Sequence, residues 1–128
     1  MIILYILIGI VILFVSMQLF IRFQSKFKKG KDAKGLTGYI GDAVRHGGKI
    51  LLYFYSPTCG ACRQQTPIID DLPKSQATIF KVDVSKDAKT ALALGVLGTP
   101  STVIIENGFI KEFILGYISR DKILKYIQ

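Results

Sequence analysis

The sequence is poor in residues that bind metal ions, with two cysteines and one histidine among its 128 residues. A closed zinc site needs about four nitrogen, sulfur or oxygen ligands, most often cysteine and histidine, so the chain cannot build one by itself. The two cysteines are Cys59 and Cys62, with only Gly60 and Ala61 between them. A structural disulfide across so short a loop removes little entropy from the unfolded chain. Two inert buried thiols remain the ordinary alternative to a reactive pair.

Charged side chains are absent from residues 1–21, where Ser16 and Gln18 interrupt an otherwise apolar run. About 20 residues of α-helix span the ~30 Å hydrocarbon core of a bilayer. A cleaved signal peptide fits poorly, because the run has no basic n-region, is too long, and is followed by no small-x-small cleavage site. We therefore predict one transmembrane helix over residues 1–21.

Positive charge is concentrated directly after this predicted helix, in residues 22–36. Its basic members are Arg22, Lys26, Lys28, Lys29, Lys31 and Lys34, against the single acid Asp32. Because basic residues favour the cytoplasmic side of a membrane, we expect a juxtamembrane linker here and a cytoplasmic domain after it. An extracytoplasmic domain is the alternative. Attraction to anionic lipid accounts for the basic cluster, so the net charge of +8 does not indicate nucleic-acid binding.

Residues 37–128 alternate between helical and strand patterns. Apolar periodicity and turn residues predict helices over 37–46, 60–72, 87–94 and from Ser119, and strands over 50–55, 78–84, 101–105 and 109–115. The last two strands are joined through Asn107-Gly108, a strong hairpin signal. Parallel strands joined by helices and followed by an antiparallel hairpin indicate an α/β domain, a mixed sheet with helices on both faces.

The cysteine pair lies where a predicted buried strand, 50–55, gives way to a predicted helix. The free N–H groups and the dipole at a helix N-terminus favour a thiolate. Only a thiolate attacks a disulfide, so this position favours redox chemistry at Cys59 over two inert thiols.

The order of motifs resembles the thioredoxin superfamily over residues 37–128. The motifs are Cys59-Gly60-Ala61-Cys62 after a strand, Pro67, Val82-Asp83, Gly95 to Ser101 including Thr99-Pro100, Glu106-Asn107-Gly108, and Gly116. The resemblance implies a thioredoxin-like α/β fold. The sheet is expected to be four-stranded, because the basic segment replaces the usual first strand. The 78–84 strand would then lie at an edge.

The resemblance also implies roles for particular residues. Cys59 would be the nucleophile and Cys62 the resolving thiol of a protein disulfide oxidoreductase. Thr99 and Pro100, joined by a cis peptide bond, would present backbone to the substrate, with Thr58 beside them. The implied partners are protein disulfides or dithiols, which the predicted membrane helix would place near the membrane. No cofactor is expected beyond the redox-active disulfide itself. A non-catalytic binding module on the same fold is the alternative.

Several positions depart from the family pattern. Thr58 replaces the tryptophan that usually precedes the nucleophile, and Ala61 replaces the proline inside the motif. Tyr53 stands where a buried aspartate is usual, and an ordinary tyrosine, with a pKa near ~10, is a poor base at neutral pH. Lys81 matches the lysine that usually pairs with that aspartate, so we expect it to lack its partner. Tyr53, Lys81 and Pro67 are expected to support the site.

Overall fold

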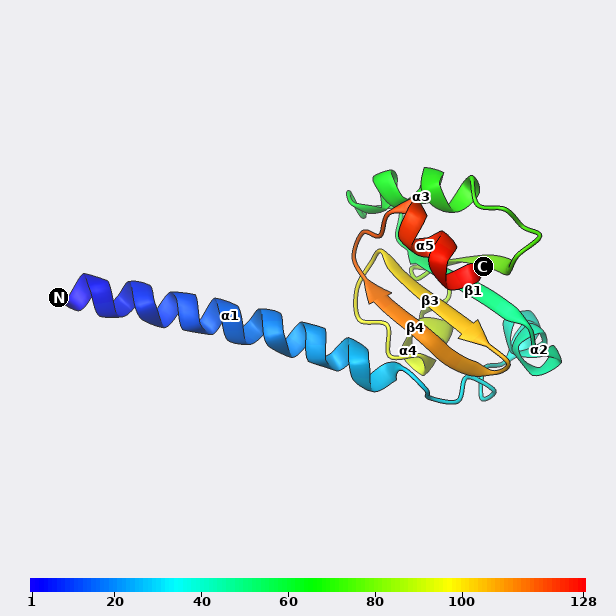
Figure 1. Cartoon of the computed structure of the whole chain (residues 1–128), viewed down its shortest axis with the longest axis horizontal. Coiled ribbons are helices and arrows are strands. Elements are labelled where there is room, and N and C mark those ends of the chain that lie inside the picture. The colour runs from blue at the N-terminus through cyan, green and yellow to red at the C-terminus, as the bar shows by residue number, and fades with distance from the viewer.

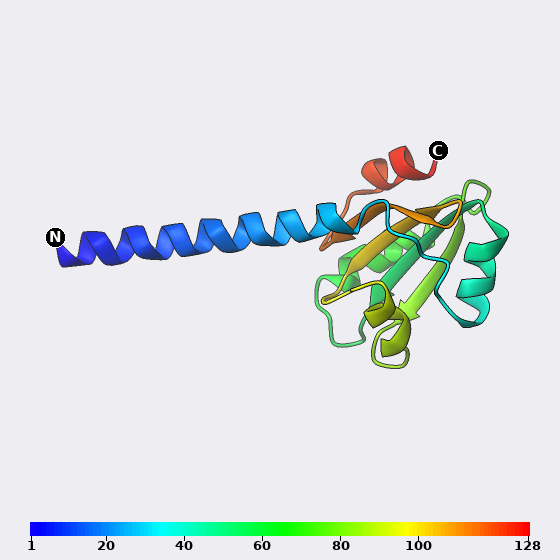
Figure 2. The same cartoon turned by 90° about the horizontal axis from the view of Figure 1, so that it is seen from below.

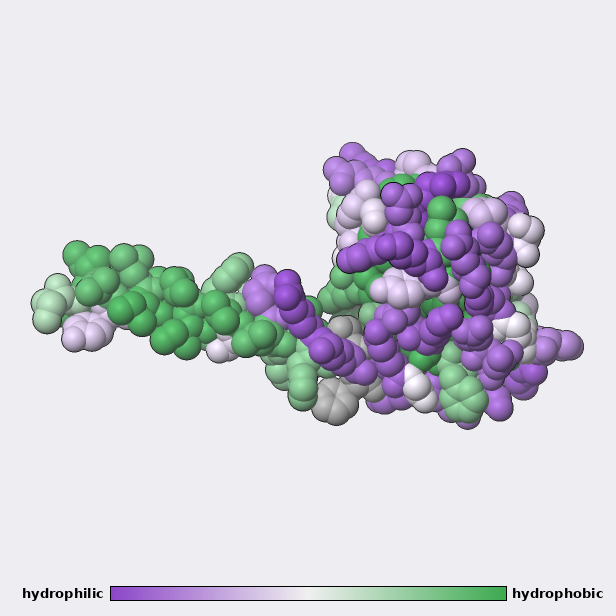
Figure 3. Space-filling model, in the orientation of Figure 1, coloured by the Kyte–Doolittle hydropathy of each residue, from purple (hydrophilic) through white to green (hydrophobic). Residues whose placement is uncertain are grey.

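The structure is a computed structural model that describes residues 1–128, apart from the side chains of residues 24, 25 and 27. A long helix, α1 (Ile2–Lys28), projects from a domain built of strands and shorter helices (Figure 1). Residues Ile2–Phe23 of α1 are long and apolar enough to cross a membrane, and none of their hydrophobic window is buried in the molecule. Figure 3 shows this apolar surface giving way to hydrophilic side chains where α1 reaches the domain.

A mixed four-stranded sheet in the order β2-β1-β3-β4 forms the centre of the domain. β1 (Lys49–Tyr55) pairs in parallel with β2 (Thr78–Asp83) and antiparallel with β3 (Ser101–Glu106). β4 (Phe109–Leu115) follows β3 as an antiparallel hairpin. The two central strands are buried almost throughout, whereas β2 lies at an edge, as predicted.

Helices cover both faces of the sheet (Figure 2). α2 (Gly38–His46) and α4 (Ala88–Ala93) pack on the face that carries Leu52 and Phe54. α3 (Cys62–Asp70) and α5 (Arg120–Ile127) pack on the opposite face. Neighbouring residues of β1 enter different cores because successive side chains of a strand point to opposite faces. The predicted fold class, a thioredoxin-like α/β domain with a mixed four-stranded sheet, is confirmed.

The basic segment expected to be a linker lies against the domain. Beyond α1, Gly30 donates a backbone hydrogen bond of 2.7 Å to Ile110 of β4, and Ile110 donates one of 2.9 Å to Lys31. Ala33 and Leu36 are buried in the core beneath α2 and α4. The end of this segment therefore continues the edge of the sheet and contributes to the core, which the charge pattern alone did not predict.

Candidate active site: a cysteine pair beside a cis proline

A short turn carries the chain from β1 to α3 and holds the first cysteine in place. The Cys59 N–H donates to the Ser56 carbonyl at 3.1 Å, and the Ser56 and Thr58 hydroxyls lie 3.0 Å apart. The helix itself begins at Cys62, after Ala61. Local hydrogen bonds thus fix Cys59 just ahead of the first turn of α3.

Cys59 and Cys62 form a disulfide, with their Cα atoms 5.3 Å apart. Cys59 is partly exposed, whereas Cys62 is only 3% exposed. The Cys62 backbone N–H points at the Cys59 sulfur from 3.2 Å. Such an N–H at a helix N-terminus stabilises a thiolate at Cys59 once the disulfide is reduced. Cys59 is therefore the more accessible residue of the pair.

The Thr99–Pro100 peptide bond is cis, as the family resemblance implied. Hydrogen bonds anchor this loop on both sides: the Ser101 hydroxyl donates to the Gly98 carbonyl at 2.6 Å, and the Gly116 N–H donates to the Pro100 carbonyl at 2.7 Å. Pro100 is buried and Thr99 is partly exposed. The loop therefore presents Thr99 at the surface from a fixed backbone.

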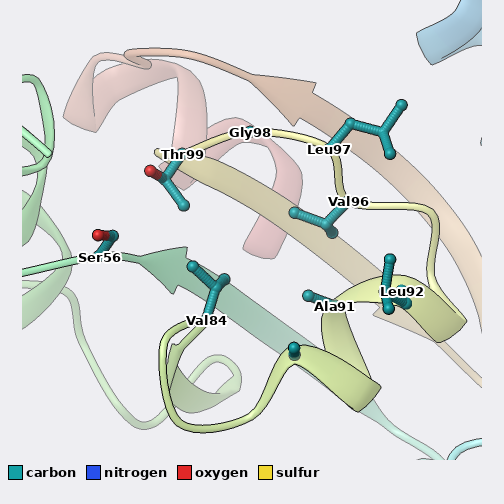
Figure 4. A pocket seen from close by; sticks show the side chains of 9 residues that line it. Ser56, Val84, Ala91, Leu92, Val96, Leu97, Gly98 and Thr99 are labelled. Atoms are coloured by element: carbon teal, nitrogen blue, oxygen red, sulfur yellow. The ribbon is translucent and has the colours of Figure 1, made fainter.

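Two hollows meet at Ser56, which lines both. The first, the apolar hollow, has a volume of about 350 Å³ and is lined mainly by Val84, Ala91, Leu92, Val96, Leu97 and Thr99. The second, the cysteine groove, is lined mainly by Cys59, Cys62, Arg63, Thr66, Pro67 and Asp70. In Figure 4, Thr99 and Ser56 face each other across one end of the apolar hollow. An extended chain that crosses Ser56 would therefore meet a reactive sulfur on one side and an apolar recess on the other.

Tyr53 lies beneath the cysteine pair and is fully buried. Its hydroxyl donates to the Cys62 carbonyl at 3.3 Å and lies 2.9 Å from the Thr66 hydroxyl. Desolvation by burial raises the pKa of Tyr53 above its usual value, although the hydrogen bond with Thr66 acts in the opposite direction. Tyr53 is therefore a neutral phenol at physiological pH that ties β1 to the start of α3, and it offers no base there.

Lys81 has an acidic partner, contrary to the expectation that its partner was lost. Its ammonium lies 2.8 Å from the Asp70 carboxylate, at the C-terminal end of α3. This hydrogen bond is the main cause that raises the pKa of Lys81. Both side chains are about half exposed, at 44% and 52%, so the pair contributes at most about 1 kcal/mol. Lys81 thus reaches the site through Asp70, which lines the cysteine groove.

The two remaining predicted site residues lie at the rim. Thr58 is exposed in the turn before Cys59. Pro67 is an exposed residue inside α3 and lines the cysteine groove. The structure therefore brings Thr58, Pro67 and the cysteine pair to one end of the sheet.

Gln65 is a buried part of the site that the sequence analysis missed. Its side-chain amide donates to the Ile118 carbonyl at 3.1 Å and accepts from the Ile118 N–H at 2.8 Å. It lies on the same helical face as Cys62 and Ile69, and all three are buried. A polar residue on an otherwise buried face was the available signal. Through this pair of bonds, Gln65 ties the helix that carries Cys62 to the segment before α5.

We expect Gln65→Met to lower the free energy of unfolding by about 2–3 kcal/mol, because both backbone groups of Ile118 lose their buried partners. Methionine keeps the volume and helix propensity of glutamine. Urea denaturation of the full-length protein in detergent measures the change. Gln64→Met, at the exposed neighbouring position, is the matched control and should shift stability by less than about 0.5 kcal/mol. Equal effects of the two changes would contradict this role for Gln65.

The match with a known family covers the region that holds the site. A family model described as Thioredoxin matches residues 40–128. The chain belongs to the thioredoxin family. It is 32% identical over 82 residues to chloroplastic thioredoxin M4 of Arabidopsis thaliana, a match that covers 62% of this chain and 42% of that protein. It is 25% identical over 84 residues to the thioredoxin of Bacillus subtilis, covering 63% of this chain and 81% of that protein.

Among solved structures, a mutant thioredoxin from Halobacterium salinarum aligns with a TM-score of 0.62 and 26% identity, covering 73% of this chain and 88% of that one. The chain spans less than half the length of the plant relatives that it matches. Within the residues that the structure describes, no group of three or more His, Cys, Asp and Glu side chains could hold a metal ion. The chain thus contains a thioredoxin-family domain in which a CxxC pair forms a disulfide.

Proposed function

We propose that this thioredoxin-family protein is a membrane-tethered thiol–disulfide oxidoreductase that acts on protein disulfides. The observation that carries the proposal is the disulfide between a partly exposed Cys59 and a buried Cys62, in a groove that meets at Ser56 the apolar hollow lined by Thr99. Thr99 is joined to Pro100 by the cis peptide bond. The partly exposed Cys59 sulfur can exchange with a substrate disulfide. The buried Cys62 sulfur can react only with the sulfur of Cys59. That asymmetry favours catalysis over a passive binding module.

The exchange runs in two balanced steps. In the reduced protein, the Cys59 thiolate attacks one sulfur of a substrate disulfide, forms a mixed disulfide and expels the other substrate sulfur as a thiolate. The Cys62 thiolate then attacks the Cys59 sulfur, re-forms the intramolecular disulfide and releases the second substrate thiolate. Two electrons pass from the cysteine pair to the substrate. The reverse sequence oxidises a substrate dithiol, and no further cofactor enters either direction.

The substrate is best bound as an extended segment. The backbone of Thr99 faces the surface at a fixed position, so it can pair with an extended peptide as the edge of a sheet does. Thr58 would flank the same segment from the turn before Cys59. The adjoining apolar hollow suits an apolar side chain next to the substrate cysteine.

The tether would be the apolar part of α1, Ile2–Phe23. The basic residues that follow it favour a domain on the cytoplasmic side. Confinement beside the membrane raises the effective concentration of membrane-bound partners over soluble ones. We therefore assign the substrates to proteins at or near the inner face of the membrane.

Exchange with a disulfide peptide in membrane vesicles tests this function. The full-length protein, reduced and present in native membranes, should oxidise its cysteine pair when the peptide is added to inverted vesicles, and not when it is added to right-side-out vesicles. Alkylation of the remaining thiols after acid quenching measures the reaction. Exchange on the right-side-out side alone would favour the extracytoplasmic alternative. Exchange in neither preparation, with the peptide disulfide shown to be reducible by a small dithiol, would leave the binding-module alternative.

A further inference from the structure

The C-terminal end of α1 is fixed to the domain by several contacts. The Lys28 ammonium donates to the Gly95 carbonyl and lies 4.3 Å from the centroid of the Phe113 ring. Next to it, Lys29 forms a 2.7 Å ion pair with Glu112 of β4. The backbone bonds between residues 30–31 and β4 follow directly. Because these contacts are consecutive along the chain, they fix the orientation of α1 relative to the domain.

α1 leaves the domain at the end that carries the cysteine pair. In Figures 1 and 2 the turn before α3 and the loop before β3 both lie at the end of the domain from which α1 leaves. The contacts agree, because Lys28 binds Gly95, which begins the loop that leads to Thr99–Pro100. The cis-proline loop therefore starts at the last turn of α1.

The distance between this end of the domain and the apolar part of α1 is short. The apolar segment ends at Phe23 and the helix ends at Lys28, so the last five residues of the helix, 24–28, follow the apolar segment. Five residues correspond to about 7–8 Å of helix. A bilayer around Ile2–Phe23 would consequently have its surface close to the cis-proline loop and the cysteine pair.

The surface at this end combines exposed leucines with nearby basic residues. Leu92, Leu97 and Leu115 are exposed to 68%, 76% and 46%. A Cβ built at Gly98 would lie 3.3 Å from the Leu115 side chain, and Leu92 and Leu97 line the apolar hollow beside Gly98, so the three are neighbours. In Figure 4 the Leu97 side chain points away from the floor of the hollow. Exposed leucines next to a lysine-rich helix end suit the boundary between anionic headgroups and acyl chains.

We propose that the domain rests with this leucine surface, Leu92, Leu97 and Leu115, on the headgroup layer of an anionic bilayer. The cysteine pair then faces the bilayer, and its substrates are disulfides of integral membrane proteins that lie in or next to that layer. This substrate class rests on the proposed oxidoreductase function, and the chemistry is the same exchange: Cys59 bonds to one target sulfur, the other leaves as a thiolate, and Cys62 displaces the first. An anionic bilayer matches both the exposed leucines and the positive charge of the lysines at the end of α1.

Fluorescence quenching by lipids tests the orientation without any redox step. Full-length protein carrying Cys59→Ser and Cys62→Ser receives a single new cysteine through Leu97→Cys and is labelled with an environment-sensitive fluorophore. The matched control is Gln76→Cys. Gln76 is exposed and precedes the first residue of β2, at the end of that strand that lies away from the cysteine pair. Both are placed in vesicles of phosphatidylcholine and phosphatidylglycerol that contain lipids brominated near the headgroup. The probe at 97 should lose most of its fluorescence, and the probe at 76 should keep it.

Equal quenching at the two positions, or none at either, would overturn the proposed orientation. Loss of the quenching at 97 when a membrane protein is added to the vesicles would show that a protein, and not lipid, covers the leucine surface. A flexible insertion between Phe23 and Gln24 should remove the difference between the two probes, because it separates the apolar part of α1 from the contacts that Lys28 and Lys29 make with the domain. In wild-type protein, a lipid-anchored disulfide peptide should react several-fold faster than the same peptide without its anchor, and the insertion should lower this ratio. Quenching at 97 without any exchange would leave the orientation intact and remove the oxidoreductase function.

Discussion

Replacing Cys59 with serine is expected to abolish disulfide exchange, with a loss on the order of a thousandfold or more. The mixed disulfide forms on the attacking sulfur, and a serine hydroxyl cannot replace a thiolate in that step. Cys62 cannot take over, because it is 3% exposed and its backbone lies within the first turn of α3. The rate of thiol loss with a disulfide peptide, measured on the full-length protein in inverted vesicles, gives the size of the effect.

Cys62→Ser is the matched control, because it leaves the attacking sulfur in place. This variant should complete the first step and then stop, since no second thiol can displace the substrate. A mixed disulfide should therefore accumulate, visible on a non-reducing gel and lost on adding a dithiol. If Cys59→Ser accumulated the adduct and Cys62→Ser did not, the two roles would be reversed.

Local sequence signals were sufficient to predict the strands and the hairpin. The turn between β3 and β4 is one case: Asn107 and Gly108 both have positive φ, 52° and 85°, which is the conformation that made Asn-Gly a hairpin signal. The ends of α3 were predicted less well, as 60–72 instead of Cys62–Asp70. The residue before the helix, Ala61, makes no side-chain cap, so no local pattern marks the start.

Contacts between residues far apart in the sequence were not predictable from one chain. Gln65 meets Ile118, and Lys81 meets Asp70, only because α3 packs across the sheet. Lys29 belongs to a basic cluster whose composition indicates lipid, yet its ammonium pairs with Glu112. Periodicity and charge counts describe neighbours along the chain, and these pairs depend on which elements the fold brings together.

Tyr53→Asp is expected to lower the free energy of unfolding by about 4–5 kcal/mol. The ring is fully buried in the core cluster that also contains Ile69 and Ile104, so the smaller side chain leaves a cavity. The new carboxyl also replaces a phenol whose hydroxyl is bonded to the Cys62 carbonyl and to Thr66. Burial should raise the pKa of that carboxyl above its value in the unfolded chain. The stability of the variant should therefore fall as the pH rises from the unfolded-state pKa through the folded-state pKa. Urea midpoints at about pH 4 and pH 7 measure both effects.

The same substitution should nevertheless speed the resolving step near neutral pH. A carboxylate beneath Cys62 can accept the proton that this thiol must lose before it attacks the mixed disulfide, and Tyr53 cannot, because burial raises its pKa further from neutrality. Lys81 lies opposite position 53 in the strand register, so its positive charge favours the ionised form of the new aspartate. This effect is weakened because Lys81 is already paired with Asp70. Tyr53→Phe separates the two effects, since it removes only the hydroxyl and should cost about 1–2 kcal/mol with no gain in rate. Single-turnover release of the substrate thiol, measured in all three proteins, decides the issue: an aspartate variant no faster than the phenylalanine variant would mean that the proton of Cys62 leaves by a route that does not pass position 53.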